Sequence, residues 1–563
     1  MMREKIKASI QEVMEETFRS PHIKFSVVST EDSAHGDYAS NIGFVCERLV
    51  AVQVNSHVGQ VEGLHNLRTP RQFAEKIKQA LDAKEIDFIE RAEVAGAGFV
   101  NFFLKDDVVL RVLGQVLENA DTWGASDIGK GKTVMVEYTD PNPFKEFHIG
   151  HLMSNAIGES MARLHEIIGA NVLRVNWQGD IGLHIAMAVW GMQKGESYLG
   201  PAYVAGATAY RTDPEAKEEI EAINRKIYDR SDPEINKLYQ EGRQGSLDYF
   251  EKIYARLGTR FVHYFFESEM GPKGVEIVRR HSEIFERSEN AIVFRGEKYN
   301  LHTRVFINSQ GLPTYEAKEL GLNQEKFRLY HPDLSLIVTG NEITDYFKVL
   351  LKVMELIMPD VAVHTRHIPH GMLRLSSGKM SSRTGDVITA EWLIQEVKNR
   401  LPENTDEAVA MASIKYSILK QNIGSDIIFD FDKSVTFQGD SGPYLQYTYA
   451  RLKSILRKLQ ITNYKLQITD TNVEMDALER HLAVLTLRFP EAIEDALAIY
   501  SPHVLAAYLY DLAKTANEFY HSHPVMQEED ADKKHLRLAL VSATAITLAR
   551  GLNLLGIETP EEM

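Results

Sequence analysis

The spacing of hydrophobic and polar positions changes along the chain and divides it into segments of different predicted structure. Residues 1–18 alternate charged and apolar side chains at helical spacing, which predicts an amphipathic helix. A polar turn follows at HGDYASN (35–41), then a helix around 71–81 and a closing strand at VAGAGFVNFFL (94–104). We therefore expect residues 1–120 to form a small additional α+β domain.

After the glycine-rich break GASDIGKGK (124–132), strands and helices are predicted to alternate. KTVMVEY (132–138) is a predicted strand, residues 152–168 an amphipathic helix, and ANVLRVNW (170–177) the next strand. A strand, helix and strand in this order predict a parallel sheet that binds ligands at the carboxyl ends of its strands. The expected fold class is α/β, with a Rossmann-like catalytic domain over residues 121–390.

Charged helical sequence at about 195–290 interrupts the alternation and is interpreted as an insertion in this domain. Strands are predicted to resume at RVFIN (304–308), LSLIVTG (334–340) and VAVHTRHI (361–368). Beyond residue 391 the chain is predominantly helical, with a hinge at GDSGPYLQY (439–447). We predict a connecting stem over 391–436 and an α-helical bundle over 437–563.

Composition and charge narrow the classes of function. The net charge of −16 argues against a protein that coats nucleic acid non-specifically, because phosphates would be repelled on average. One basic run, RLKSILRKLQITNYK (451–465), contains no acid and is either a solvated helix face or a local nucleic-acid surface. The N-terminal 18 residues lack the apolar core of a signal peptide, and no stretch approaches the roughly 20 apolar residues that span a bilayer. A single cysteine excludes an intramolecular disulfide and suits a reducing cytoplasm.

Candidate chemistry begins in the turn VEYTDPNPFKEFHIGHL (136–152), which joins the first strand of the alternating segment to its helix. His148 and His151 are three residues apart at the start of the helix, so they fall on one face. Gly150 between them lets a ring or phosphate approach the backbone, and the helix N-terminus adds unpaired N–H groups. This turn predicts a nucleotide site, although two such histidines could also ligate a metal or serve a structural role.

A second anion-binding candidate is the loop SSGKMSSRTGD (376–386), rich in hydroxyl and N–H donors. HIGH at 148–151 followed by KMSSR at 379–383 resembles the paired signatures of class I aminoacyl-tRNA synthetases. Longer segments are similar to arginyl-tRNA synthetases in particular: PNPFKEFHIGHL, AGAGFVNFFL, FDFDKSVTFQGDSGPYLQYTYAR (429–451) and the terminal GLNLLGIETPEEM. The resemblance extends over the whole chain, including the additional N-terminal domain.

The resemblance implies an arginine–tRNA ligase that uses ATP, L-arginine and tRNA(Arg), with tRNA needed for activation. Mg²⁺ is expected to accompany ATP without a dedicated protein site, and a cytoplasmic monomer without membrane association is expected. The catalytic residues implied are Lys145, His148, His151 and Lys379, and the ATP-binding residues also include Gly150, Met380 and Arg383.

Residues for the other two substrates are implied in the same way. The expected arginine-binding residues are Glu137, Asn142, Asp180, Tyr315 and Glu319, and Asn341 and Glu342 are further candidates; the expected tRNA-binding residues are Phe99, Asn101, Tyr444, Gln446, Tyr447 and Arg451. A guanidinium is planar and always charged, so carboxylates and an aromatic face suit it. The chain departs from the family at Lys318 and Glu319, where relatives usually have arginine followed by aspartate.

The loop departs from the family pattern too, because Ser382 replaces its second lysine and Arg383 its final serine. Arginyl enzymes that lack this loop lysine often carry a lysine three residues before the first histidine of HIGH, and this chain has Lys145 there. We therefore predict that Lys145 supplies the missing charge, with Arg383 as a weaker helper.

Three alternatives remain at this point. A zinc protein could use His364, His367 and His370, although side chains three apart on a strand do not converge. The chain could also be a tRNA-binding protein without activity, or a class I enzyme that charges a different amino acid.

Overall fold

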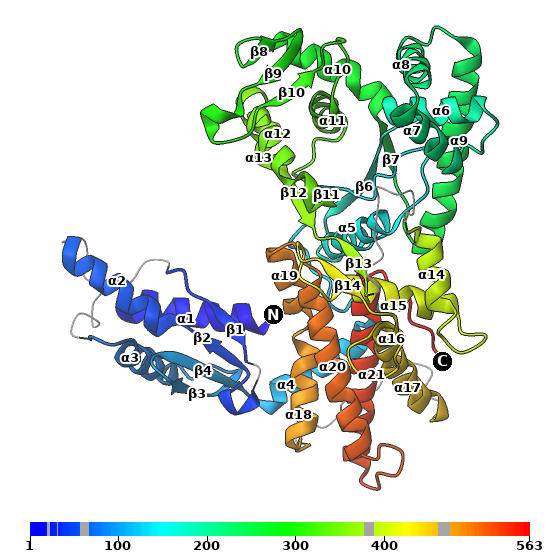
Figure 1. Cartoon of the computed structure of the whole chain (residues 1–563). Coiled ribbons are helices and arrows are strands. Elements are labelled where there is room, and N and C mark those ends of the chain that lie inside the picture. The colour runs from blue at the N-terminus through cyan, green and yellow to red at the C-terminus, as the bar shows by residue number, and fades with distance from the viewer. Residues whose placement is uncertain (20–22, 31, 57–66, 377–387, 460–472) are drawn as a thin grey trace.

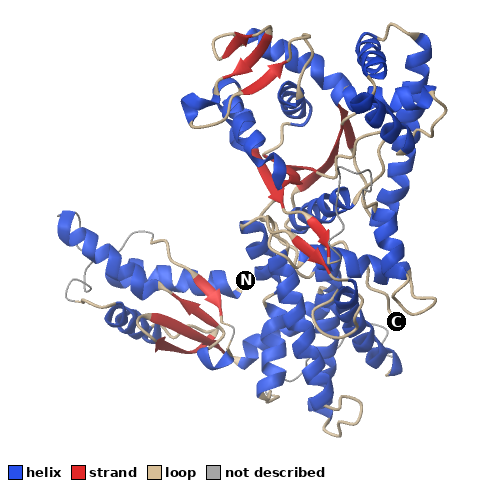
Figure 2. Ribbon diagram, viewed as in Figure 1, coloured by secondary structure: helices blue, strands red, loops and turns tan. Residues whose placement is uncertain are grey.

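The computed structural model describes residues 1–563 except 20–22, 31, 57–66, 377–387 and 460–472. Figure 1 shows an N-terminal unit that projects to one side, a sheet-containing unit at the top and a helical bundle below it, and Figure 2 shows that strands are confined to the first two units and their junction with the bundle. Among the described residues, no helix combines the length and apolar character needed to cross a bilayer.

The N-terminal unit is an antiparallel sheet with strand order β1-β2-β4-β3, packed against helices. Its elements are α1 (Met2–Phe18), β1 (Val27–Ser29), β2 (Tyr38–Ser40), α2 (Ile42–Ser56), α3 (Pro70–Ala83), β3 (Ile89–Ala95) and β4 (Phe99–Leu104). The single closing strand predicted at 94–104 is wrong, because Gly96 and Gly98 take positive φ angles of 51° and 157° and turn the chain between β3 and β4.

Helix α4 (Asp106–Glu118) leaves the N-terminal unit and packs against the bundle helices α18 (Ala477–Leu487) and α21 (Ala531–Leu554). Charged contacts hold the same junction. Arg480 of α18 pairs with Asp37 at 2.8 Å and with Asp106 at 2.8 Å, and the Arg488 guanidinium donates to the backbone oxygen of Thr30 at 3.0 Å. These contacts fix the N-terminal unit to the bundle.

The central unit is built on a five-stranded parallel sheet with the order β12-β11-β5-β6-β7. Its strands are β5 (Thr133–Glu137), β6 (Asn171–Gln178), β7 (His263–Phe266), β11 (Leu334–Gly340) and β12 (Thr365–His370), and α5 (Ile149–Ile167) connects β5 to β6. The chain proceeds outward from β5 on one side and from β11 on the other, so the order reverses between these two strands. Ligands bind such sheets at the reversal point, beyond the carboxyl ends of the strands.

Further elements surround this sheet. The helices are α6 (Leu183–Gln193), α7 (Pro201–Thr212), α8 (Pro214–Asp229), α9 (Pro233–Leu257), α10 (Glu267–Arg280), α11 (Tyr315–Tyr330), α12 (Thr344–Ile357) and α13 (Pro359–His364). The strands β8 (Phe285–Ser288), β9 (Ala291–Phe294) and β10 (Arg304–Ile307) form a small antiparallel sheet. Short 3-10 helices are η1 (Ser33–His35), η2 (Ala120–Thr122), η3 (Gly296–Tyr299) and η4 (Asn341–Ile343).

Three expectations for this unit need correction. RVFIN is a strand, but β10 pairs with β9 of the small sheet rather than joining the parallel one. The segment expected as a helical insertion at 195–290 contains β7, which pairs with β6 as the fifth parallel strand. VAVHTRHI is only half a strand, because Pro359 starts the short helix α13 before β12 begins at Thr365.

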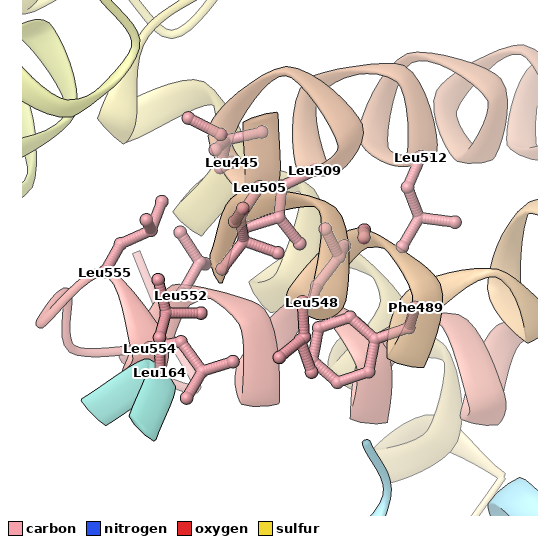
Figure 3. Close-up of a cluster of buried hydrophobic side chains, with 14 of the residues drawn as sticks. Leu164, Leu445, Phe489, Leu505, Leu509, Leu512, Leu548, Leu552, Leu554 and Leu555 are labelled. Atoms are coloured by element: carbon pink, nitrogen blue, oxygen red, sulfur yellow. The ribbon is translucent and has the colours of Figure 1, made fainter. Parts of the chain in front are cut away.

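The bundle is helical, as the sequence predicts, whereas the segment before it contains two short strands, β13 (Leu373–Leu375) and β14 (Ile427–Phe429), which pair in parallel. The helices from residue 390 onward are α14 (Ala390–Lys398), α15 (Glu407–Leu419), α16 (Phe431–Ser434), α17 (Gly442–Lys458), α18, α19 (Phe489–Ala498), α20 (His503–Ser522) and α21. Figure 3 shows Leu164 of α5 among buried leucines of the bundle such as Leu505 and Leu552. Burying each such side chain contributes about 1.5–3 kcal/mol, so α5 is anchored in the bundle core.

Candidate active site

The turn after β5 is held in a strained conformation. Thr139, Asp140 and Phe144 have φ angles of 81°, 46° and 68°, each of which costs about 1–3 kcal/mol in a residue with a side chain. Hydrogen bonds to neighbouring elements hold the turn in this conformation. The Asp140 carboxylate accepts the Trp177 N–H at 2.8 Å, and the Ser246 hydroxyl of α9 accepts the Phe144 N–H at 2.8 Å. Strain maintained by several contacts is typical of functional sites.

His148 and His151 cap the N-terminus of α5 reciprocally. His148 Nδ1 accepts the backbone N–H groups of Gly150 at 3.1 Å and His151 at 3.4 Å, while His151 Nδ1 accepts the His148 N–H at 3.2 Å. The two rings stack with centroids 3.5 Å apart. Because each Nδ1 accepts a backbone N–H, each neutral ring carries its proton on Nε2 and can donate from there.

Both histidines are neutral near pH 7. Burial, followed by the charge on Lys145, lowers the pKa of His148 to about 4. Burial also lowers the pKa of His151 well below its usual value. Since the Nδ1 lone pairs are engaged and Nε2 holds the proton, the metal-binding alternative for this pair is not supported.

Glycine is required at position 150 because the His148 ring lies directly against its backbone. A Cβ atom at this position would lie 2.9 Å from Cε1 and 3.0 Å from Nδ1 of His148. Any larger residue would therefore push the His148 ring away from its capping position.

A cavity of about 760 Å³ opens at the reversal point of the sheet, between the ends of β5 and β11. It brings together most of the described residues for which catalysis or binding of ATP or arginine is predicted: Glu137, Asn142, Lys145, His148, Gly150, His151, Tyr315, Glu319 and Glu342. Lys379, Met380 and Arg383 lie outside the described residues, so their predicted roles stay predictions.

Three carboxylates at the cavity are already neutralised by cations of the chain. Glu137 pairs with the fully buried Lys326 of α11. Glu267 pairs with Lys318 at 2.6 Å, and the Glu316 carboxylate lies 3.9 Å from Arg304. These pairs stabilise buried charge, and they also reduce the negative charge available to a cationic substrate.

Three other acids in the cavity, Asp140, Glu319 and Glu342, form no ion pair within the described part of the chain. Burial, reinforced by the charge on Glu137, raises the pKa of Glu319 to about 8. Burial and Glu137 also raise the pKa of Asp140 well above its usual value. The site therefore holds protons that a bound cation would displace.

Asp180 does not line the cavity, which corrects the expectation that it binds substrate. It is fully buried, and its carboxylate accepts from Arg243 at 2.9 Å, Tyr239 at 3.1 Å and the Ser268 hydroxyl at 2.8 Å. These partners lie on α9 and α10, so Asp180 fixes both helices to the end of β6. Asn341, the first residue of η4, is likewise absent from the cavity lining.

The sequence-based site omits Lys326, Glu267 and Asp140. Lys326 follows Glu319 by two helical turns, so it faces the same side of α11 as that predicted substrate-binding acid and reaches Glu137. Lys318, noted as a departure from the family, is tied to Glu267 and donates to the Ile181 carbonyl at 3.3 Å. It is therefore part of the frame around the cavity.

The zinc alternative is not supported by the histidines proposed for it. His364 Nδ1 contacts the Asp333 carbonyl at 2.8 Å, His367 Nε2 the Thr339 hydroxyl at 2.8 Å, and His370 Nδ1 the Gly371 carbonyl at 2.8 Å. Their ring nitrogens point to different partners and do not form a ligating group among the described residues.

On the N-terminal unit, the two residues expected to contact tRNA differ in exposure. Phe99 is 43% exposed and packs edge-on against Phe44, with ring centroids 4.9 Å apart. Asn101 is only 5% exposed and sits in the middle of β4 between β2 and β3. Phe99 is thus available for stacking, whereas the predicted hydrogen bond from Asn101 is not favoured by its burial.

A second cavity, of about 910 Å³, lies in the bundle and is lined by Tyr447, Arg451 and Tyr520. The Arg451 guanidinium lies 4.7 Å from the ring centroid of Tyr447 and 4.9 Å from that of Tyr520. Flat rings beside a guanidinium suit the stacking of a nucleic-acid base.

Gln446 and Tyr444 are less available than predicted. Gln446 is fully buried, and its amide donates to the Glu558 carbonyl at 2.7 Å, so it holds the C-terminal segment and does not face tRNA. The Tyr444 hydroxyl accepts from Asn517 at 3.1 Å. The basic run is also partly neutralised, because Lys453 pairs with Glu561 at 2.9 Å and Arg457 with Glu562.

Family models match three parts of the chain. A model described as the arginyl tRNA synthetase N terminal domain matches residues 2–104. The catalytic domain of tRNA synthetases class I (R) matches residues 112–431, and the DALR anticodon binding domain matches residues 445–563.

Similar proteins and structures agree with these matches. An arginine–tRNA ligase of Clostridium kluyveri is 31% identical over 522 residues, covering 88% of this chain and 91% of its own, and one from Fusobacterium nucleatum is 29% identical and covers 96% and 95%. The Plasmodium falciparum arginyl-tRNA synthetase structure, at 21% identity and covering 100% of this chain and 99% of its own, has the same fold with a TM-score of 0.80. The Thermus thermophilus structure, at 23% identity and full coverage of both chains, gives 0.76. With a catalytic model that matches more than half of its length, the chain belongs to the class I arginyl-tRNA synthetases.

Proposed function

We propose that the cavity between β5 and β11 carries out both steps of arginine–tRNA ligation. A carboxylate oxygen of L-arginine attacks the α-phosphorus of ATP, the bond to the bridging oxygen breaks, and pyrophosphate leaves. A ribose hydroxyl of the terminal adenosine of tRNA(Arg) then attacks the carbonyl carbon, and AMP leaves. The observation that carries this proposal is that one cavity contains both the helix N-terminus capped by His148 and His151 and acids that have no ion pair among the described residues.

Glu319 is the proposed partner of the substrate guanidinium. Glu137, Glu267 and Glu316 each have an internal cation, whereas Asp140, Glu319 and Glu342 have none among the described residues. Of these three, Glu342 is exposed, whereas Glu319 is buried on α11 one helical turn after Tyr315. A guanidinium offers five donors and a permanent charge, so it would replace the proton that Glu319 holds in the empty site. Tyr315, more than half exposed at the start of α11, would cover the guanidinium with its ring.

The phosphates of ATP are proposed to lie at the other end of the cavity. His148 and His151 would donate from Nε2, the α5 N-terminus adds its partial positive charge, and Lys145 supplies a full charge. Neutral donors and a nearby cation stabilise the negative charge that develops on pyrophosphate. Mg²⁺ enters with ATP as part of that substrate.

The tRNA is proposed to contact both the N-terminal unit and the bundle. Phe99 would stack on a base from the N-terminal unit, and Tyr447 and Arg451 would hold a base in the cavity of the bundle. We also propose a monomer, because one chain supplies every residue assigned to the reaction. A cytoplasmic location suits the single buried thiol of Cys46.

Amino-acid-dependent exchange of pyrophosphate into ATP tests this function. We expect exchange with arginine, dependent on tRNA(Arg), and none with lysine, glutamine or citrulline. Citrulline is the sharpest comparison, because it keeps the shape of arginine and lacks its charge. Exchange with another amino acid, or none with arginine in the presence of tRNA(Arg), would overturn the proposal.

The raised pKa of Glu319 predicts how arginine binding depends on pH. A bound guanidinium favours the carboxylate, so binding releases a proton and strengthens as pH rises toward the free pKa of about 8. The KM for arginine should fall roughly eightfold between about pH 7 and pH 8.5. In Glu319→Gln, measured over the same range, this dependence should largely disappear; an equal slope in both proteins would refute the assignment.

A further inference from the structure

The Lys145 side chain contacts an aromatic ring instead of a carboxylate. Its ammonium lies 4.5 Å from the ring centroid of Tyr203, and no described acid forms an ion pair with it. Lys145 and Tyr203 both line the active-site cavity. Burial lowers the pKa of Lys145, so a partner that favours the cation helps to keep it charged.

Tyr203 lies on α7, and α7 is held rigidly against α6. A Cβ atom on Gly191 of α6 would lie 2.2 Å from the carbonyl oxygen of Ala202, and one on Gly206 of α7 would lie 2.0 Å from that of Met187. Such direct backbone contact leaves little freedom for the helix that carries the ring.

The start of α7 is also tied to the catalytic turn. The N–H of Gly200 donates to the carbonyl oxygen of Phe144 at 3.2 Å, immediately before Lys145. The Tyr198 hydroxyl donates to the Gly245 carbonyl of α9 at 3.3 Å, which fixes the same loop on its other side. The ring of Tyr203 therefore has a defined position relative to the backbone that carries Lys145.

We propose that Tyr203 is a positioning residue, whose ring face holds the Lys145 ammonium at the phosphate side of the cavity. An aromatic face attracts a cation without neutralising it, whereas a carboxylate in its place would repel the phosphates of ATP. The helical insertion thereby contributes to adenylate formation without touching substrate. This inference rests on the proposed role of Lys145.

The test compares Tyr203→Leu, Tyr203→Phe and Tyr210→Leu, alone and combined with Lys145→Ala. Tyr210 is a matched control on the same helix, bonded to Glu221 and absent from the cavity lining. In arginine-dependent pyrophosphate exchange with tRNA(Arg) present, Tyr203→Leu should lower kcat/KM for ATP by about threefold to thirtyfold. Tyr203→Phe and Tyr210→Leu should stay within about twofold of the unmodified protein, since one keeps the ring face and the other lies elsewhere.

The double variants distinguish the positioning role of Tyr203 from the proposed role of Lys145, on which it depends. Once Lys145 is alanine, Tyr203→Leu should have less than about a twofold further effect, because its target is gone. Multiplicative losses, or equal losses from Tyr203→Phe and Tyr203→Leu, would overturn the positioning role. If Lys145→Ala itself has no effect, the proposed role of Lys145 fails instead.

A further variant distinguishes loss of the charge on the ring face from misfolding of Tyr203→Leu. Trifluorophenylalanine at position 203 keeps the shape of phenylalanine but withdraws charge from the ring face. We expect activity near that of Tyr203→Leu, with the melting temperature of Tyr203→Phe. Activity equal to Tyr203→Phe would overturn the inference.

Discussion

Replacing Lys145 by alanine is expected to slow arginyl-adenylate formation about 100-fold, or about 2.7 kcal/mol, with a much smaller loss for Arg383→Ala. Lys145 lines the cavity beside His148 and is carried by a turn that α9 fixes through Ser246. A cation held on a rigid frame loses little entropy when phosphate binds, so its charge is fully available to the transition state.

Single-turnover formation of the adenylate, followed with tRNA(Arg) bound, measures this difference. Lys194→Ala is a suitable control, because Lys194 is exposed at the end of α6, stacks on Trp190 of that helix and lies outside the cavity lining. Comparable losses from Lys145→Ala and Arg383→Ala would mean that the loop arginine supplies the charge instead.

The second large effect is expected for Glu319→Gln, which should raise the KM for arginine by roughly 100-fold while leaving the KM for ATP nearly unchanged. Removing one partner of a buried charged pair costs about 3–5 kcal/mol, and part of this remains as the hydrogen bond to the glutamine oxygen. Glu316→Gln, on the same helix but already beside Arg304, should raise the arginine KM far less.

The same substitution should stabilise the empty protein at alkaline pH. An acid whose folded pKa is raised to about 8 lowers stability as pH rises from its unfolded value, near 4.3, through 8. Glutamine at 319 removes that penalty, so the melting temperature should increase at about pH 8.5. A parallel increase in the KM for both substrates, or a lower melting temperature at this pH, would contradict the assignment of Glu319.

The central part of the fold could be predicted because its signals are local. Periodicity predicts β5, α5 and β6, and the turn after β5 together with the start of α5 places Lys145, His148, Gly150 and His151 within seven residues. The sheet order was not predictable in the same way, since β7 is a four-residue strand whose pairing with β6 depends on contacts across the helical insertion.

The electrostatics of the cavity could be predicted only in part. A carboxylate at the end of β5 was expected to face the substrate, yet Glu137 is paired with Lys326 from the distant helix α11. Asp180 also carries the right chemistry for a substrate contact, and its bonds to Arg243 and Ser268 use its carboxylate within the protein. Sequence identifies the acids, whereas tertiary packing determines which of them remain available.

The most direct measurement identifies the amino acid that the protein attaches to tRNA. Purified protein, ATP with Mg²⁺, total tRNA and an equimolar mixture of amino acids are incubated, and the esterified amino acid is identified by mass spectrometry after mild alkaline release. We predict arginine alone, attached to tRNA(Arg), with the yield strongly reduced in Lys145→Ala and Glu319→Gln. A different esterified amino acid, or equal yields of arginine from all three proteins, would contradict the account.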